Sequence, residues 1–279
     1  MSFYTALSGL KAAQNDLSVI SNNVANVNST SFKKSRAVFG DIFAAAPMQT
    51  TTQVAGQGTR ISGVQQQFTQ GTVETTDKTL DLAITGEAFF TVRTAPPTSQ
   101  TSYTRNGAFA LDENRYVIDT TGARLQILPV NATTGVPTST AASALTDLQL
   151  PQSYTDGTGT VIQLSSVSIN EQGLITATFA DSTTQKLGNV GLAAFPSNEG
   201  LRQQGDAHWQ ATLQSGNPVY GAGNAGLFGR IRSGALERSN VDLTAELVAL
   251  IAAQQNFQAN AKAIETETTV ANAMINLRG

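Results

Sequence analysis

The chain has 279 residues, of which 40% are hydrophobic and 13% are charged, and its formal net charge is −3. This composition argues against a disordered chain, and the weakly acidic balance offers no basic footprint for nucleic acid. The absence of cysteine and the single histidine exclude disulfides, thiol chemistry and a histidine-rich metal site. No apolar run approaches about eighteen residues, so we expect no membrane insertion. The first residues also lack the basic start and apolar core of a cleavable signal peptide.

The N-terminal stretch, residues 2–27, carries apolar residues at helical steps of three and four. Small residues such as Gly9 lie between the bulky ones and would let a partner backbone approach closely. Three asparagines end the stripe, although asparagine is a poor residue for a helix interior. Their amides either bond across to another helix or chain, or are solvated at a fraying helix end. The candidate contact residues of this stretch are Leu7, Leu10, Leu17, Asn22, Asn23 and Asn26.

The residue pattern changes twice in the middle of the chain. Residues 31–70 are rich in Thr, Ser, Gly and Ala and predict an extended connector. From 71 to 238 the apolar period becomes two, with turn signals such as Asn106-Gly107 between short β-rich runs. This pattern predicts a mainly antiparallel β domain. Residues 129–160, rich in Thr, Ser, Ala and Pro, form either a long surface loop of it or a reduced extra lobe.

The C-terminal stretch, residues 239–279, predicts one long helix, because it has no internal Gly or Pro and its apolar residues recur at alternating steps of four and three. Ser239, followed three residues later by Asp242, is a plausible capping signal. Such a helix would be about 55 to 60 Å long. A helix of that length needs a partner. Its candidate contact residues are Leu243, Leu247, Leu250, Phe257 and Ile264.

The fold class is therefore expected to be α+β, with residues 1–30 and 239–279 pairing as a coiled-coil-like module around the inserted β domain. The helices are poor in bulky residues for their length. The apolar area they bury, at ~25 cal/mol per Å², could hardly offset the cost of ordering their backbone, at ~1 to 2 kcal/mol per residue. We infer that the pair is marginal alone and orders fully against other copies, so self-assembly is a hypothesis from the residues themselves.

The inventory of candidate catalytic residues is nearly empty. Residues 221–226 satisfy the G-x-G-x-x-G pattern, but they precede a strand-like run instead of opening a helix, which argues against a phosphate cradle. His208 beside Asp206 lacks a nucleophile elbow and a second histidine, so a structural role is favoured. Asp77, Asp81 and Asp112 are expected in turns or on a solvated face. We expect no catalytic, cofactor or metal residue, although a glycan-binding or glycan-cleaving β domain remains an alternative.

Five segments resemble one known family. The stretch LSGLKAAQNDLSVISNNVANVNSTSFKKS resembles the N-terminal signature of bacterial flagellar rod and hook proteins, and SGALERSNVDLTAELVALIAAQQNFQANAKAIET resembles their C-terminal signature. The segments LDLAITGEAFFTV, YTRNGAFALDENRYVID and LGNVGLAAFPSNEGL follow the family order between them. The chain departs from the family at Ser31 and Ala88, where glycine is usual. Unless its φ is negative, Ser31 would stiffen the backbone where the chain leaves the first helix.

The resemblance implies a structural protein of the bacterial flagellum. SFYTALSGLKAAQ with FKKSRAVFGDIFA is most similar to hook subunits, which implies a curved, hollow, self-assembling tube that acts as a universal joint between motor and filament. A straight, distal rod protein is the alternative, because the chain is short for a hook subunit. The implied partners are copies of itself, the rod, hook-cap and hook–filament junction proteins and the type III export apparatus, with no cofactor. The implied location is the extracellular flagellum. The three asparagines would act as polar locks between helices of the tube.

Overall fold

The computed structural model describes residues 2–42, 56–97, 99–157 and 159–276. The chain divides into two compact units. The first comprises residues 1–28, 33–67 and 241–279, and the second comprises 29–32 and 68–240. The expected α+β class is confirmed: an N-terminal and a C-terminal helix contact each other, and a large antiparallel β domain is inserted between them in the sequence.

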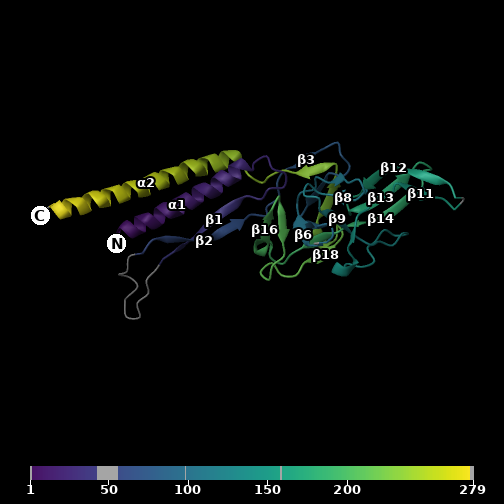
Figure 1. Ribbon diagram of the computed structural model, residues 1–279, viewed down its shortest axis with the longest axis horizontal. Coiled ribbons are helices and arrows are strands. Elements are labelled where there is room, and N and C mark those ends of the chain that lie inside the picture. Colours follow the sequence, from purple (N-terminus) through teal and green to yellow (C-terminus); the bar gives the residue numbers. More distant parts are fainter. Residues whose placement is uncertain (1, 43–55, 98, 158, 277–279) are drawn as a thin grey trace. The chain divides into compact units, whose positions relative to one another are not determined.

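The first unit is built on α1 (Ser2–Ala25) and α2 (Leu243–Asn276), which run side by side (Figure 1). The start of α2 differs from the expected one. Asp242, not Ser239, caps the helix, since the amides of Thr244 and Ala245 donate to Asp242 Oδ1 at 2.9 and 3.2 Å. The 34 residues of α2 give it a length of about 50 Å.

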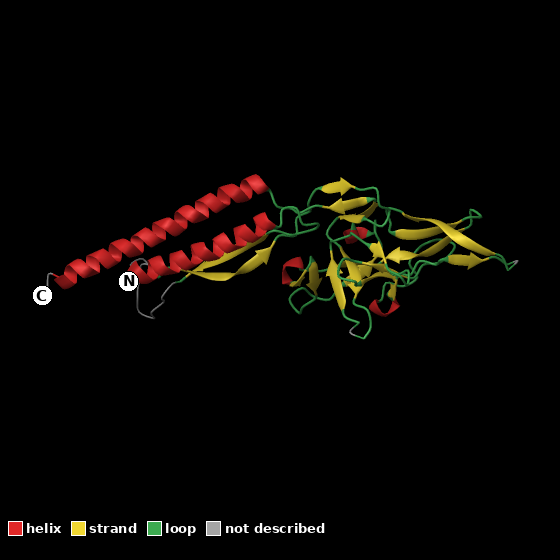
Figure 2. Cartoon of the chain, turned by 45° about the horizontal axis from the view of Figure 1, so that its top comes forward, coloured by secondary structure: helices red, strands yellow, loops and turns green. Residues whose placement is uncertain are grey.

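A two-stranded hairpin of β1 (Ser35–Asp41) and β2 (Thr59–Gln66) lies along α1 in the same unit (Figure 2). The predicted connector, residues 31–70, therefore contains paired strands. The register shifts at a bulge after Val38, so that Val38 opposes Gly63 while Phe39 opposes Ile61. A lone hairpin is marginally stable in water, and here both strands pack against α1, with Ala37 buried.

The second unit is organised around an antiparallel sheet that, within the described residues, has fourteen strands. Along its main path the order is β11-β12-β13-β14-β9-β5-β6-β17-β16. Two further antiparallel pairs, β19 with β4 and β20 with β3, complete the unit. The strands, in chain order, are β3 (Val73–Thr75), β4 (Leu82–Thr85), β5 (Phe89–Arg93), β6 (Thr101–Thr104), β7 (Ala110–Leu111), β8 (Val117–Ile118), β9 (Arg124–Leu128), β10 (Thr146–Asp147), β11 (Ser153–Thr155), β12 (Val161–Ile169), β13 (Leu174–Phe179), β14 (Thr184–Val190), β15 (Leu192–Ala194), β16 (Arg202–Gly205), β17 (His208–Gln210), β18 (Val219–Gly221), β19 (Arg230–Ser233) and β20 (Ala235–Glu237).

The core of this unit has two clusters, one on each face of β5. Consecutive side chains of a strand point to opposite faces, so Phe90 packs with aliphatic residues while Phe89 packs with Trp209 and other aromatic rings. Residues 129–160 are integrated into this unit. Strand β10 pairs with β9 and β11 pairs with β12, and both Leu148 and Leu150 are buried in the aliphatic cluster.

Candidate functional site

The contact between α1 and α2 is fixed by two close approaches. Gly9 of α1 faces Asn260 of α2 so closely that a Cβ on residue 9 would lie 2.6 Å from Asn260 Oδ1. About 21 Å further along, at about 1.5 Å per residue, Asn23 Nδ2 donates to Glu246 Oε2 at 3.1 Å. The helices are therefore antiparallel, and the atoms of α2 that lie closest to Gly9 belong to the Asn260 side chain and not, as expected, to the partner backbone.

Asn23 is the polar centre of the first unit. It is buried, its Nδ2 donates to the Ser35 carbonyl oxygen at 2.8 Å, and its Oδ1 accepts from the Ser35 amide at 2.9 Å. One side chain thus joins α1 to α2 and to β1. The interpretation that an asparagine amide bonds across to another element is confirmed for Asn23. The amide of Asn26 instead donates back to the Asn22 carbonyl oxygen at 3.0 Å, within the end of α1.

Two of the carboxylates on the helix pair, those of Glu246 and Asp16, are shielded from full solvent exposure. Glu246 is buried and Asp16 is half-buried. Burial raises the pKa of Asp16, and the negative charge of Glu246 raises it further. Keeping Asp16 ionised therefore opposes the pairing of the helices at neutral pH.

The predicted contact residues fall into two groups. Six apolar ones are half-buried, namely Leu7, Leu10, Leu17, Leu250, Phe257 and Ile264. Leu243 and Leu247, at 44% exposure each, instead continue into an exposed stripe with Val248 and Ile251. We call Leu243, Leu247, Val248 and Ile251 the root patch.

Apart from Asn23, the buried positions between the two helices were not among the predicted contact residues. These are Ala13 and Ile20 on α1 and Glu246 and Ala253 on α2. They recur at steps of seven, so a heptad pattern that admitted alanine and glutamate would have found them.

The last turns of α2 extend past the start of α1. In the antiparallel register set by Gly9 and Asn260, the first residue of α1 reaches about residue 267 of α2. Beyond it lie three large apolar side chains that are more than half exposed. We call these residues, Val270, Met274 and Ile275, the tip patch.

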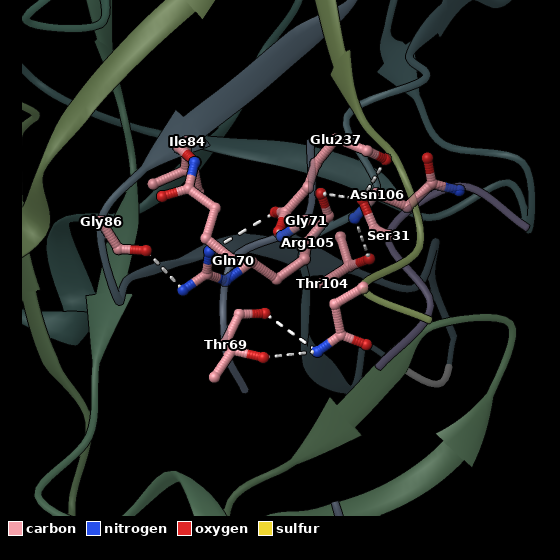
Figure 3. Close-up of polar contacts among 11 residues, drawn as sticks. Ser31, Thr69, Gln70, Gly71, Ile84, Gly86, Thr104, Arg105, Asn106 and Glu237 are labelled. Carbon is pink, nitrogen blue, oxygen red and sulfur yellow. Dashed lines mark hydrogen bonds and ion pairs between the residues drawn. The ribbon is translucent and has the colours of Figure 1, made fainter. Parts of the chain in front are cut away.

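A buried polar cluster forms a second feature, within the β unit, where the chain segments that lead to the first unit begin (Figure 3). Ser31 lies here with a φ of 56°, the left-handed region, and it is fully buried. Its amide donates to the Glu237 carbonyl oxygen at 2.9 Å and its hydroxyl to the Arg105 carbonyl oxygen at 2.7 Å. The serine therefore adopts the conformation for which glycine is the usual residue, with its hydroxyl satisfying a buried carbonyl.

Arg105 and Glu237 form an ion pair inside this cluster, with Nη1 of Arg105 3.5 Å from Oε2 of Glu237 and both side chains buried. Arg105 Nη2 also donates to the Gly86 carbonyl oxygen at 2.7 Å, and the guanidinium lies 5.2 Å from the centre of the Phe89 ring. Burial lowers the pKa of Arg105, whereas Glu237 opposes that shift. Sequence spacing alone could not reveal this pair, because 132 positions separate its members.

The residues considered for catalysis are used structurally. His208 Nε2 lies 2.7 Å from Asp119 Oδ2 and its Nδ1 lies 2.9 Å from the Asp206 carbonyl oxygen, so the buried ring joins β17 to the turn before β9. The expectation that Asp81 lies on a solvated face is wrong: Asp81 is buried, because its backbone pairs with Ala108 inside the unit. Asp112 caps a turn by accepting the Asn114 amide, as expected.

The glycine-rich segment 221–226 ends β18 and leads into a 3-10 turn, and a Cβ on Gly221 would collide with the Phe228 ring at 2.3 Å. Close packing accounts for this glycine. Within the ranges that the structure describes, no group of acidic and histidine side chains could hold a metal ion, and neither helix is apolar enough over a sufficient length to cross a membrane.

Comparison with known proteins identifies the family in three places along the chain. Residues 3–33 match the family described as Flagella basal body rod protein, 83–177 match the Flagellar hook protein FlgE/F/G D1 domain, and 232–277 match the Flagellar basal body rod FlgEFG protein C-terminal family. The flagellar basal-body rod protein FlgG of Bacillus subtilis is 33% identical over 293 residues, covering 99% of this chain and 98% of that protein. The chain belongs to the flagellar rod and hook protein family.

Other relatives in the family carry both names. The FlgG rod protein of Borreliella burgdorferi is 31% identical over 287 residues, with 99% of this chain and 97% of that protein covered. The flagellar hook protein FlgE of Salmonella typhimurium is 28% identical over 412 residues, with both chains fully covered. Rod and hook relatives are thus about equally similar to this flagellar chain, and the family is one of structural proteins of the flagellum.

Proposed function

We propose that the chain is the structural subunit of a flagellar hook, which assembles with copies of itself into a curved, hollow tube and acts as a universal joint between motor and filament. The names of the hook relatives and the match of residues 83–177 to the hook-protein D1 domain support this proposal. The role is mechanical and requires no catalytic residue or cofactor. Further partners would be rod, hook-cap and hook–filament junction proteins, and the type III export apparatus would deliver the chain to the extracellular flagellum.

The observation that carries self-assembly is the position of the two apolar patches on α2. The root patch lies in the first turns of the helix and the tip patch in its last turns, with a mostly polar exposed surface between them. Large exposed apolar groups gathered on one element mark an interaction surface. A contact between the root patch of one copy and the tip patch of the next joins different surfaces, so it builds a ring where its rotation closes and an open helical polymer where it does not.

Assembly can be tested with a variant that alters only the root patch. Leu247→Gln, Val248→Gln and Ile251→Gln together keep good helix-forming residues while removing the apolar surface. The matched control replaces three equally exposed valines of the β unit, Val136, Val161 and Val219, by glutamine. We expect the unaltered chain and the control to form filaments visible by electron microscopy, and the root-patch variant to sediment as a monomer. Filaments of the root-patch variant would refute the proposal.

A rod subunit is the second candidate, and one observation favours it. The alignment with the Bacillus subtilis rod protein runs over 293 residues, close to the 279 residues of this chain, whereas the alignment with the Salmonella typhimurium hook protein runs over 412. The same helix chemistry would then build a straight, stiff tube. The shape of the polymer separates the two candidates: curved filaments support a hook subunit, and straight ones a rod subunit.

A further inference from the structure

Every covalent connection between the two units starts from three short segments of the β unit. The chain passes between the units at residues 28–29, 32–33, 67–68 and 240–241. The segments on the β-unit side are 29–32, 68–72 and 237–240. Any force carried along the backbone from one unit to the other must pass through these three segments, so their attachment to the β unit decides how that force is received.

Glu237 belongs to the third segment, residues 237–240. Its three oxygen atoms contact the first segment, the second segment and the interior of the β unit, one each. Its carbonyl oxygen accepts the Ser31 amide at 2.9 Å, from the first segment. Its Oε1 accepts the Gly71 amide at 2.8 Å, from the second segment. Its Oε2 faces Arg105 Nη1 at 3.5 Å, and Arg105 is fixed to the Gly86 carbonyl oxygen (Figure 3). A single residue thus joins all three segments to the interior.

The packing around these bonds leaves the segments little freedom. A Cβ on Gly71 would lie 2.0 Å from the Arg238 carbonyl oxygen, so only glycine fits where the second segment passes the third. The side-chain Nδ2 of Asn240 donates to the Thr69 carbonyl oxygen at 3.0 Å, and the backbone N–H of Asn240 donates to the Phe32 carbonyl oxygen at 3.3 Å. These bonds close a loop of contacts in which the Glu237 carboxylate faces the buried Arg105 guanidinium and Ser31 Oγ donates to the Arg105 carbonyl oxygen.

Burial makes the ion pair at the centre of this arrangement hard to rearrange. Arg105 is 1% exposed and Glu237 is fully buried. Removing one member of a buried pair leaves an uncompensated charge away from water, so the pair resists separation more strongly than a surface pair does. The neighbouring pair of Glu74, on β3, with Arg238, which directly follows β20, is about half exposed on both sides and lacks this property.

We propose that Glu237 is a positioning residue for the mechanical role of the subunit: its carboxylate, held by Arg105, locks the three connecting segments onto the β unit so that torque passes without local slippage. The mechanical role of this lock rests on the proposed function. The lock itself is a property of the single chain. It can therefore be measured without any polymer.

The test compares Glu237→Ala with Glu74→Gln, which removes the exposed carboxylate of the same strand pair. Native-state hydrogen exchange is followed at the Ser31 and Gly71 amides in the full chain. The Thr91 amide, which is buried and donates to the Gly191 carbonyl oxygen at 3.0 Å, is the internal reference for the unit as a whole. We expect Ser31 and Gly71 to exchange at least about tenfold faster relative to Thr91 in Glu237→Ala, and to be unchanged in Glu74→Gln.

If Glu237→Ala does not fold because the charge of Arg105 is left buried, the double variant Arg105→Met/Glu237→Ala removes that charge, and the same loss of protection is expected. In polymers of either variant, the proposal expects lower torsional stiffness than in the unaltered polymer. Equal protection of Ser31 and Gly71 in the unaltered chain and in the folded variant would overturn it. Faster exchange in a chain that never forms filaments would instead support the lock and contradict the proposed function.

Discussion

Gly9 and Asn260 lie in contact across the helix pair, and a methyl group on residue 9 would fall 2.6 Å from Asn260 Oδ1. Asn260 is itself held in place, because its Nδ2 donates to the Asn256 carbonyl oxygen at 2.8 Å. A glycine in the interior of a helix normally costs about 1 kcal/mol relative to alanine. Its presence in α1 is explained by the side chain that it accommodates on α2.

The first prediction is that the effect of Gly9→Ala changes sign with residue 260. When Asn260 is present, the new methyl group of Gly9→Ala displaces its side chain. We therefore expect a lower melting temperature of the helices, followed by ellipticity at 222 nm. In an Asn260→Ala background that conflict is absent, and the same substitution should stabilise the helices by about 1 kcal/mol through helix propensity. Equal effects in the two backgrounds would show that the contact does not couple the residues.

Ser31 gives the second prediction, which concerns the β unit. Ser31→Ala removes the hydroxyl that donates to the Arg105 carbonyl oxygen and leaves the left-handed φ unchanged, so we expect a loss of about 1 to 3 kcal/mol. Ser31→Gly loses the same bond but gains back about 1 kcal/mol from relief of φ strain. The expected order of stability is serine, then glycine, then alanine.

Trp209 is a suitable reporter for this order, because it is the only tryptophan and is buried in the aromatic cluster of the β unit. Urea unfolding followed by its fluorescence gives the midpoint for each variant. A glycine variant more stable than the unaltered chain would mean that the hydroxyl bond does not offset the strain at residue 31.

The sequence predicted the pairing of the terminal helices because a heptad stripe needs a second surface to cover it. It did not predict which stripe of α2 faces α1. Bulky residues marked Leu243 and Leu247, which are exposed, whereas Ala253 and Glu246 are buried. Small residues and bonded polar groups occupy the buried contact between the helices, so hydrophobicity alone does not find those positions. The assignment of Leu243 and Leu247 to an interface between subunits stays a prediction.

The polar cluster of the β unit could not be predicted for a different reason. Ser31, Arg105 and Glu237 are separated by 74 and 132 positions, and only the completed strand pairing brings them together. The departure from glycine at Ser31 was visible in the sequence. Whether serine is tolerated at this position depends on its hydrogen bond to the Arg105 carbonyl oxygen, and local sequence patterns do not predict such a tertiary contact.

The third prediction concerns pH and the pair of His208 and Asp119. The Asp119 hydrogen bond and charge raise the pKa of His208 above 6.5 against the effect of burial, while the bonds from His208 and Thr121 lower the pKa of Asp119 below 3.8 despite burial. The histidine contribution is complete below pH 6.5 and is lost as pH rises through the folded-state pKa. The aspartate contribution is complete above pH 3.8 and is lost as pH falls.

The β unit should therefore be most stable between about pH 4 and 6.5. The measurement is the urea midpoint of Trp209 fluorescence across this range. His208→Gln should remove the decline in stability above pH 6.5, and Asp77→Asn, at a carboxylate with no part in the pair, should retain it. An unaltered decline in His208→Gln would assign the pH dependence to other groups.

The fourth prediction concerns Asp16 in the first unit, whose pKa is shifted in the opposite direction to that of Asp119. Burial and the charge of Glu246 raise the pKa of Asp16 above 3.8, so the folded helix pair binds a proton more tightly than the unfolded chain does. Stability contributed by residue 16 is therefore lost as pH rises from about 4 through the folded-state pKa, and remains lost at neutral pH.

Replacing Asp16 by asparagine keeps the size of the side chain and removes the charge. We expect Asp16→Asn to raise the melting temperature of the helical signal at pH 7 and to have little effect near pH 3.5, where the native carboxyl is protonated as well. Asp242→Asn is an informative comparison, because Asp242 caps α2 and its carboxylate also complements the helix dipole, so its neutralisation should lower the melting temperature at pH 7. Opposite signs for two aspartates in one helix pair would separate the cost of a buried charge from the benefit of a capping one. Destabilisation by Asp16→Asn at pH 7 would instead mean that its carboxylate makes a favourable contact in the folded pair.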